Sequence, residues 1–215
     1  MENTTISKQA LARMPYYLGY LKKLEAACVT NVSAPMVAAA LRLNEVQVRK
    51  DLAAVSHTAG KPRTGFVVAE LVQDIEHYLG YDNVNSAVLV GVGTLGRALL
   101  SYKGFADYGL DIIAAADTNP DLIGTEINGK KIMDPTHLAE LCRRTHVHIG
   151  IITVPGESAQ EACDILLAAG VLAIWNFAPT HLEVPEYILV QNENMASSLA
   201  LLSKHLKERL SRESE

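Results

Sequence analysis

Three glycines carry the clearest chemical signal in the sequence. Gly91, Gly93 and Gly96 directly follow a short apolar run and open a helical pattern, in the order G-x-G-x-x-G. In this arrangement the first glycine permits a tight turn, the second lets a pyrophosphate approach the backbone, and the third allows close packing of helix on strand. The helix would also offer unpaired N–H groups and the positive end of its dipole to a phosphate. The predicted phosphate-binding turn comprises Gly91, Val92, Gly93, Thr94, Leu95 and Gly96.

An acidic residue follows the glycines at the distance that a dinucleotide site requires. A second apolar run, residues 110–116, ends at Asp117, about 20 residues after the last glycine. Its carboxylate would accept hydrogen bonds from the adenosine ribose hydroxyls and repel a 2′-phosphate. Thr118 and Asn119 follow without a cation, so the sequence predicts NAD(H) rather than NADP(H). A tight strand–helix turn without any cofactor is the competing interpretation, which the acid disfavours.

Alternating strands and helices must position these residues. Five apolar runs are predicted as strands, and helical patterns separate most of them, which is typical of a parallel sheet in an α/β fold. Ligands of such sheets bind outside the carboxyl ends of the strands, where the segment 153–155 also falls. We therefore predict a Rossmann-like domain over residues 84–192. The predicted strands are residues 87–90, 110–116, 147–154, 171–175 and 187–190.

The residues before this domain, 1–80, favour a winged helix-turn-helix. Ser7–Ala27 has the leucine spacing of an amphipathic helix, which Pro15 is expected to interrupt and restart. Two short helices follow, residues 34–41 after a capping Ser33 and residues 45–55 after a capping Asn44. The tight turn between them is typical of a helix-turn-helix.

The second short helix and the segment after it are expected to contact DNA. In the helix, Val46, Leu52 and Val55 are predicted to face inward. The segment 56–68 is turn-rich and basic and ends in β-prone residues, which suits a wing that contacts phosphates or the minor groove. An ordinary helical subdomain with solvated charges is the alternative. The predicted DNA-contacting residues are Asn44, Gln47, Arg49, Lys50, Lys61 and Arg63.

The charge distribution also favours a polyanionic partner. The net charge is −5, but residues 1–68 carry nine Lys and Arg against four Asp and Glu, whereas residues 69–215 carry ten against twenty. A basic head on an acidic body fits double-stranded DNA. No apolar run approaches the ~18 residues of a membrane span, so we expect no membrane partner. Three cysteines at no metal-binding spacing favour a reducing cytoplasm and predict no metal site.

Seven short segments carry a resemblance to a known family. They are Met14–Tyr17, Val48–Leu52, Gly91–Gly96, Ser101–Phe105, Ile123–Glu126, Ile151–Pro155 and Trp175–Pro179. Together, in this order and over nearly the full length, they resemble the Rex family of bacterial transcriptional repressors that respond to the NADH/NAD⁺ balance. The resemblance implies a repressor that NADH releases from a palindromic operator.

The resemblance also implies a homodimer and roles for further residues. The C-terminal helix, within residues 193–215, would swap between subunits, although from the residues alone its leucine face could cover its own domain. In the family, residues at matching positions surround the nicotinamide or change contacts at the dimer interface. The matching nicotinamide residues are Thr153, Val154, Pro155, Asn176 and Phe177, and the matching interface residues are Arg13 and Tyr102.

Some residues depart from the family pattern. The segment Arg49–Ser56 lacks the aromatic residues usual in the recognition helix, and the wing has fewer glycines. Asn194 stands where the family often has an Asp that opens the last helix in a switch network with an Arg. An amide makes a weaker hydrogen bond to a cation than a carboxylate does, so we expect a weaker or differently set response to NADH.

Two other protein classes share parts of this pattern. An NAD-dependent oxidoreductase would need a substrate domain and a proton donor, but no His or Lys sits beside an acid at a strand end, so we predict no catalytic residue. His181 is the histidine expected nearest the site. A CoA-binding domain resembles the region 151–155, but Asp117 and the basic head favour the repressor.

Overall fold

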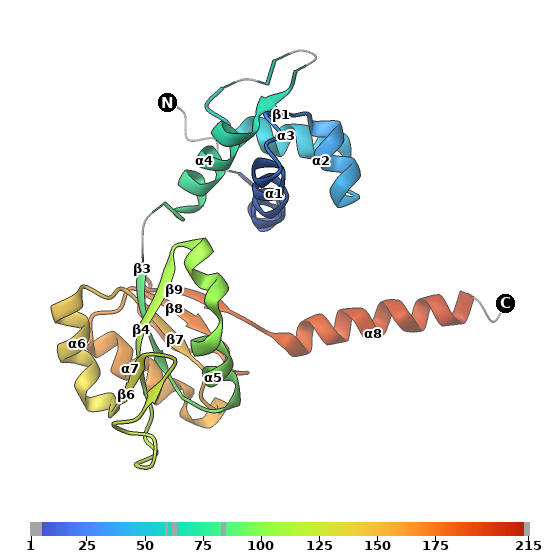
Figure 1. Ribbon diagram of the computed structural model, residues 1–215. Coiled ribbons are helices and arrows are strands. Elements are labelled where there is room, and N and C mark those ends of the chain that lie inside the picture. Colours follow the sequence, from blue (N-terminus) through green and yellow to red (C-terminus); the bar gives the residue numbers. More distant parts are fainter. Residues whose placement is uncertain (1–5, 59, 62–63, 83–84, 213–215) are drawn as a thin grey trace. The chain divides into compact units, whose positions relative to one another are not determined.

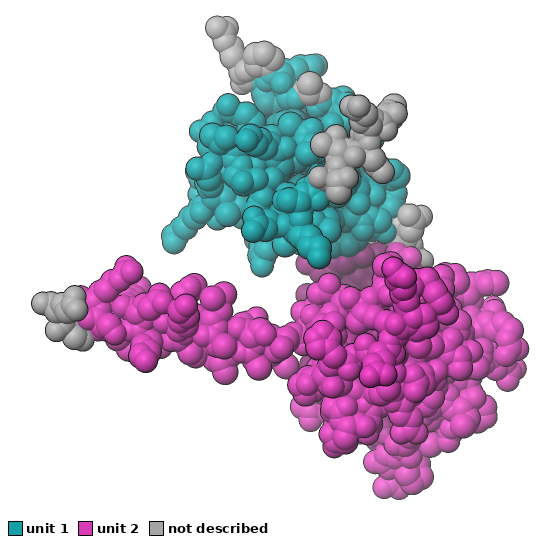
Figure 2. Space-filling view, turned by 180° about the vertical axis from the view of Figure 1, so that it is seen from behind, with its two compact units in different colours: residues 1–83 teal, residues 84–215 magenta. Residues whose placement is uncertain are grey.

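The chain forms two compact units. The computed structural model describes residues 6–58, 60–61, 64–82 and 85–212 (Figure 1). Contacts divide the chain into residues 1–83, the head, and residues 84–215, the sheet unit (Figure 2).

Helices pack around a short antiparallel sheet in the head. Capping side chains fix where the helices begin, because Ser7, Ser33 and Asn44 each accept a hydrogen bond from a backbone N–H in the first turn. Such a cap contributes about 1 kcal/mol to the stability of a helix. The helices are α1 (Lys8–Ala26), α2 (Ala34–Leu41), α3 (Glu45–Val55) and α4 (Val68–Leu79), and the strands are β1 (Asn31–Val32) and β2 (Phe66–Val67).

The predicted helix-turn-helix and wing are present. Strand β2 pairs with β1, and ahead of it Lys61 and Gly65 form an isolated antiparallel bridge with backbone hydrogen bonds of 2.8 and 2.9 Å. Gly65 has a φ of +74°, and a Cβ there would lie 2.1 Å from the carbonyl oxygen of Val32. Only glycine therefore lets the wing close against β1.

Two expectations about the head were wrong. Helix α1 continues through Pro15 without restarting. In α3 the inward position belongs to Val48, which is fully buried, whereas Val46 is 59% exposed. Val48, Leu52 and Val55 follow the i, i+4, i+7 spacing of one helical stripe, and residue 46 lies on the opposite side.

The sheet unit has the predicted α/β architecture. Its strands lie in the order β5-β6-β4-β3-β7-β8-β9, and all neighbouring pairs are parallel except β5 with β6. The β5–β6 hairpin turns at Asn128 and Gly129, which both have positive φ. The strands are β3 (Asn85–Val90), β4 (Leu110–Ala116), β5 (Glu126–Ile127), β6 (Lys130–Met133), β7 (Ile149–Ile152), β8 (Ala173–Asn176) and β9 (Leu189–Asn192).

Both faces of this sheet are covered. Along β3, Val88 and Val90 belong to one core cluster, whereas Ala87 and Leu89 belong to another. The alternation places one core on each face, as a doubly wound sheet requires. The helical elements are α5 (Thr94–Ser101), η1 (Lys103–Tyr108), η2 (Pro135–His137), α6 (Leu138–Thr145), η3 (Gly156–Ser158) and α7 (Ala159–Ala168).

The last helix, α8 (Met195–Arg212), has no buried residue. Its leucines Leu199, Leu202, Leu206 and Leu210 are each more than half exposed. Across the described parts of the chain, no helix combines the length and apolar character needed to cross a membrane.

Candidate functional site

The glycine-rich turn connects β3 to α5 at the centre of the sheet. The N–H of Gly91 donates to the carbonyl of Ala116, and Gly91 has a φ of +98°. A Cβ at Gly91 would lie 2.6 Å from Val154, and one at Gly96 would lie 2.0 Å from the carbonyl oxygen of Gly91. These two glycines are therefore required by close packing at the turn.

Gly93 has a different environment. A Cβ at this position would meet no heavy atom within 4 Å, so protein packing does not explain the glycine. Gly93 instead leaves open space directly before the first turn of α5, whose N–H groups have no partner within the helix. This space and these donors fit a phosphate group.

Asp117 lies at the end of the neighbouring strand β4 and contacts the same turn. Its Oδ2 accepts a hydrogen bond of 2.6 Å from the N–H of Val92, and its Oδ1 accepts one of 2.8 Å from the N–H of Asn119. The half-buried carboxylate therefore has one oxygen directed at the turn and the other at its own loop.

Thr153 fixes the third loop of the site, after β7. Its backbone N–H donates to Val90 over 2.9 Å, and its hydroxyl donates to the carbonyl of Gly91 over 2.6 Å. Strand β7 neighbours β3 on the side opposite β4. The turns after β3, β4 and β7 thus meet where the strand order reverses, which is the usual ligand position in such sheets.

These loops line one cavity, which contains part of the predicted site. The predicted residues in its wall are Gly91, Gly93, Asp117, Thr118, Thr153, Val154 and Pro155. The cavity wall does not include the predicted residues Val92, Thr94, Leu95, Gly96, Asn176 and Phe177. Residues that the sequence analysis missed are Val90, Pro135, Ser158, Glu161, Ala162 and Ile165. Most of the missed residues share one face of α7 and the turn before it, a face visible in their three- and four-residue spacing.

Asn176 and Phe177 follow the next strand, β8. The fully buried side chain of Asn176 accepts from the N–H of Ala178 and donates to the carbonyl of Thr180 and to Asn192. Its amide therefore holds the loop after β8 in shape, and Phe177 is the half-buried side chain that this loop presents.

An aromatic cluster joins this loop to the residues expected at the interface. Phe177 packs on Trp175 with ring centroids 4.9 Å apart, Trp175 packs on Phe105 at 5.7 Å, and Phe105 packs on Tyr102 at 4.9 Å. The indole N–H of Trp175 donates to Glu193 over 2.9 Å. The next residue, Asn194, accepts a 3.0 Å hydrogen bond from the N–H of Ser197 at the start of α8.

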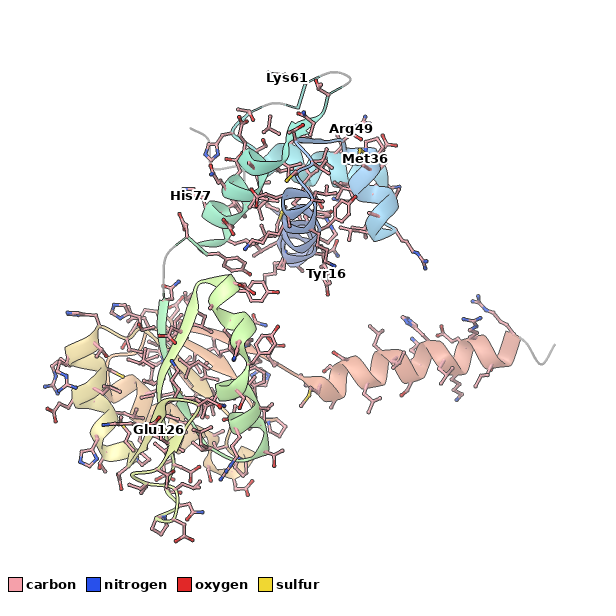
Figure 3. All side chains as sticks on the ribbon, viewed as in Figure 1. Tyr16, Met36, Arg49, Lys61, His77 and Glu126 are labelled. Atoms are coloured by element: carbon pink, nitrogen blue, oxygen red, sulfur yellow. The ribbon has the colours of Figure 1, made fainter. Side chains whose placement is uncertain are left out.

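The predicted DNA-contacting residues gather on α3 and the wing. Arg49 on α3 and Lys61 on the wing are labelled in Figure 3, and both side chains are exposed. Arg49 pairs with Glu45 one turn earlier, and Lys50 is exposed beside it. A surface hollow includes Arg49, Lys61 and the N-terminus of α2. Arg63 lies outside the described residues.

A buried acid connects α3 to α1. Asp51, only 3% exposed, accepts hydrogen bonds from Arg13 at 2.7 and 3.1 Å and from the hydroxyl of Tyr17 at 2.8 Å. Burial and the bond to Asp51 raise the pKa of Tyr17 to about 12. Arg13 therefore lies in an ion pair within the head.

Among the residues that the structure describes, no group of three His, Cys, Asp or Glu side chains could hold a metal ion.

Two family models match the two units. A model described as "CoA binding domain" matches residues 82–180, and one described as "Putative DNA-binding protein N-terminus" matches residues 5–53. The division between the models follows the division between sheet unit and head.

Curated relatives match nearly the whole chain. The redox-sensing transcriptional repressor Rex of Porphyromonas gingivalis is 41% identical over 205 residues, which cover 95% of this chain and 94% of the relative. The Rex proteins of Bacteroides fragilis and Treponema denticola are each 38% identical, over 95% and 90% of this chain and 93% and 91% of theirs.

Solved structures also match nearly the whole chain. The crystal structure of RSP in complex with β-NAD⁺ and operator DNA has a TM-score of 0.89 at 30% identity, covering 98% of this chain and 97% of RSP. RSP in complex with β-NADH has a TM-score of 0.83 at 30% identity, covering 99% and 100%. From this identity over nearly the full length of both partners, the chain belongs to the Rex family of redox-sensing transcriptional repressors.

Proposed function

We propose that this protein is a transcriptional repressor that binds operator DNA through its head and senses the NADH/NAD⁺ ratio through its sheet unit, with NADH releasing the DNA. One observation carries the proposal: the same chain joins a strand-end cavity, with open space at Gly93 and an acid at Asp117, to a recognition helix that exposes Arg49 and Lys50. The relatives named as Rex, and RSP with its DNA and NAD(H) complexes, support it.

The geometry of the cavity supports roles for the predicted cofactor residues. The turn Gly91–Gly96 would hold the pyrophosphate, because Gly93 leaves open space directly before the first turn of α5, whose N–H groups have no partner within the helix. Asp117 would accept hydrogen bonds from the adenosine ribose, with Thr118 beside it. Thr153–Pro155 and Phe177, whose loop Asn176 holds, would surround the nicotinamide. The cofactor would act as a ligand whose redox state is sensed, and no reaction of the cofactor on the protein is proposed.

The head would bind the major groove through α3 and the adjacent backbone through the wing. Asn44, Gln47, Arg49 and Lys50 lie on the exposed start of α3, which is the part of a recognition helix that reaches base edges. Lys61, with Arg63, would contact phosphates. A homodimer that swaps α8 would cover the exposed leucines of that helix and match a palindromic operator in a bacterial cytoplasm.

The deciding experiment is retardation of DNA with each redox form of the cofactor. Duplexes selected from a random-sequence pool by the full chain would be titrated with protein in the presence of NADH or NAD⁺. We expect NADH, but not NAD⁺, to release the DNA. Lys50→Ala should weaken binding, whereas Lys131→Ala, an exposed lysine of the sheet unit, should not. Release by neither form would contradict redox sensing.

Coenzyme A and an enzymatic role are the competing functions. The family model over residues 82–180 is described as a CoA binding domain, so coenzyme A is a specific second ligand to test. We propose that the protein is not an enzyme, since its curated relatives are named as repressors. Release of DNA by coenzyme A instead of NADH, or steady oxidation of NADH with a carbonyl substrate, would favour these alternatives.

A further inference from the structure

The carboxylate of Asp51 fixes the orientation of the side chain of Gln47. Oδ1 of Asp51 accepts a hydrogen bond of 2.8 Å from Nε2 of Gln47, one helical turn earlier. An ionised carboxylate only accepts hydrogen bonds, so the nitrogen of the amide must face Asp51. The amide oxygen Oε1 and the second N–H of Nε2 are then left for another partner.

Gln47 is also fixed through its backbone. Its N–H donates to the side chain of Asn44 over 3.1 Å, which places Gln47 in the first turn of α3. The residue is exposed, and the N-terminal residues of a recognition helix are those that contact base edges. The backbone of Gln47 and its side-chain amide are therefore both held by hydrogen bonds before any DNA is bound.

Asp51 itself has no access to DNA. It is buried, and the two other residues that bond it, Arg13 and Tyr17, come from α1. A carboxylate at the DNA surface would in any case repel phosphates. Any influence of Asp51 on base recognition must therefore act through Gln47.

We propose that Asp51 is a positioning residue that presents Gln47 for recognition of adenine in the major groove. With one N–H of Nε2 held by Asp51, the remaining N–H and Oε1 form the donor–acceptor pair that matches N7 and the N6 amino group of adenine. The recognised feature is an A·T base pair in each half-site. This inference rests on the proposed binding of DNA by the head.

A purely structural role for Asp51 predicts a different outcome. If Asp51 only balances the charge of Arg13, its loss would weaken binding to all duplexes alike. A matched control exists in Tyr17→Phe, which removes a donor to the other oxygen, Oδ2, and leaves the Gln47 bond to Oδ1 in place. Both variants disturb the same buried network. In Asp51→Asn the single acceptor oxygen is expected at the Oδ2 position, where the bonds from Arg13 and Tyr17 are 2.7 and 2.8 Å, so the amide nitrogen takes the Oδ1 position and cannot accept from Nε2 of Gln47.

The test measures discrimination rather than affinity. The full wild-type chain first selects duplexes from a random-sequence pool with NAD⁺ present, and affinities are then measured for the selected duplex and each single base-pair variant at one salt concentration. Gln47→Ala should lose the preference for one A·T pair in each half-site, about 5- to 150-fold. Asp51→Asn should lose most of the same preference, the double variant should lose no more, and Tyr17→Phe should keep it.

A second variant covers the case that Asp51→Asn does not fold. Gln47→Glu changes only the exposed residue and places two carboxylates together, so its side chain cannot be held by Asp51. Its preference for the A·T pair should also be lost. Full preference in Asp51→Asn, or no pair-specific loss in Gln47→Ala, would overturn the inference. Selection of no duplex by the wild type would overturn the proposed function instead.

Discussion

Oδ2 of Asp117 accepts a 2.6 Å hydrogen bond from the backbone N–H of Val92. The acid that is expected to bind the cofactor ribose thus also holds the second residue of the glycine-rich turn. Binding of the ribose and the shape of the phosphate-binding turn are therefore coupled through one carboxylate.

Asp117→Asn should separate these two roles. The amide oxygen of asparagine can still accept from Val92, so the turn is expected to persist. Loss of a hydrogen bond to a charged acceptor costs about 1.5–3 kcal/mol, so NADH affinity should fall roughly 10- to 150-fold and the rejection of NADPH should weaken. Titration of nicotinamide fluorescence with both cofactors measures this. Asp111→Asn, at the opposite end of the same strand, should leave both affinities unchanged, and equal behaviour of the two variants would contradict the role of Asp117.

Glu45 is expected to weaken DNA binding by pairing with Arg49. The two side chains are exposed and lie one turn apart on α3, so DNA phosphates compete with Glu45 for the guanidinium. An exposed pair of this kind contributes roughly 0.2–1 kcal/mol, so Glu45→Gln should tighten DNA binding about 1.5- to 5-fold at low salt. Glu25→Gln, an exposed acid of the head at the end of α1, makes the same change of charge. If both variants tighten binding equally, net charge and not the Arg49 pair is responsible.

Local signals predicted much of this structure. The glycine turn, the caps at Ser33 and Asn44 and the parallel strands each depend on residues that are neighbours in sequence, so pattern and spacing sufficed. The sequence Arg49-Lys50-Asp51 looks like a solvated run of charges, yet Asp51 is buried. Its ion-pair partner Arg13 is 38 residues away, and such a partner cannot be read from local periodicity.

The errors have two origins. Val46 and Val48 are equally apolar, but only Val48 shares the i, i+4, i+7 stripe of Leu52 and Val55, so local spacing was enough to choose between them. Glu161 on α7 lines the cavity because that helix begins beside the loop after β7, a proximity that the sheet order creates. At Glu161, tertiary contacts therefore decided what intrinsic preference left open.

Asp51 is expected to make the stability of the head depend on pH. Burial alone would raise the pKa of Asp51, but hydrogen bonds from Arg13, Tyr17 and Gln47 outweigh burial and leave this pKa below its ordinary value. A carboxylate with a lowered folded-state pKa contributes stability that is complete above its unfolded pKa, about 3.9, and is lost as the pH falls through the folded pKa.

Asp51→Asn should reveal this contribution. At pH 7 the free energy of unfolding should be lower than in the wild type by on the order of 3 kcal/mol, because Arg13 loses the negative charge of its buried partner. The difference should stay constant down to about pH 5 and shrink below about pH 4. Urea unfolding followed by circular dichroism measures it, with the exposed Asp107→Asn as a control. A difference that persists unchanged to pH 3 would show that the charge of Asp51 is not the cause.

Asn194→Asp should strengthen the response of operator binding to NADH. Asn194 caps α8 by accepting from the N–H of Ser197, and aspartate caps helices equally well, so the stability of α8 should not change. The variant instead places a negative charge at the start of α8, where the family resemblance implies a hydrogen bond to an Arg of the switch network. A charge-assisted hydrogen bond is about twice as strong as a neutral one, a gain of about 1 kcal/mol, so about 5-fold less NADH should release half of the bound operator.

The measurement is DNA retardation with NADH titrated against wild type and variant. The affinity of each DNA-free protein for NADH, followed by nicotinamide fluorescence, separates a change in the switch from a change in the cofactor site. Lys131→Gln changes the net charge by the same amount at an exposed position of β6 and should leave the NADH midpoint where it is in the wild type. Equal midpoints in the wild type and Asn194→Asp would mean that the neutral residue at the start of α8 does not set the response, and that the coupling between cofactor and DNA uses other contacts.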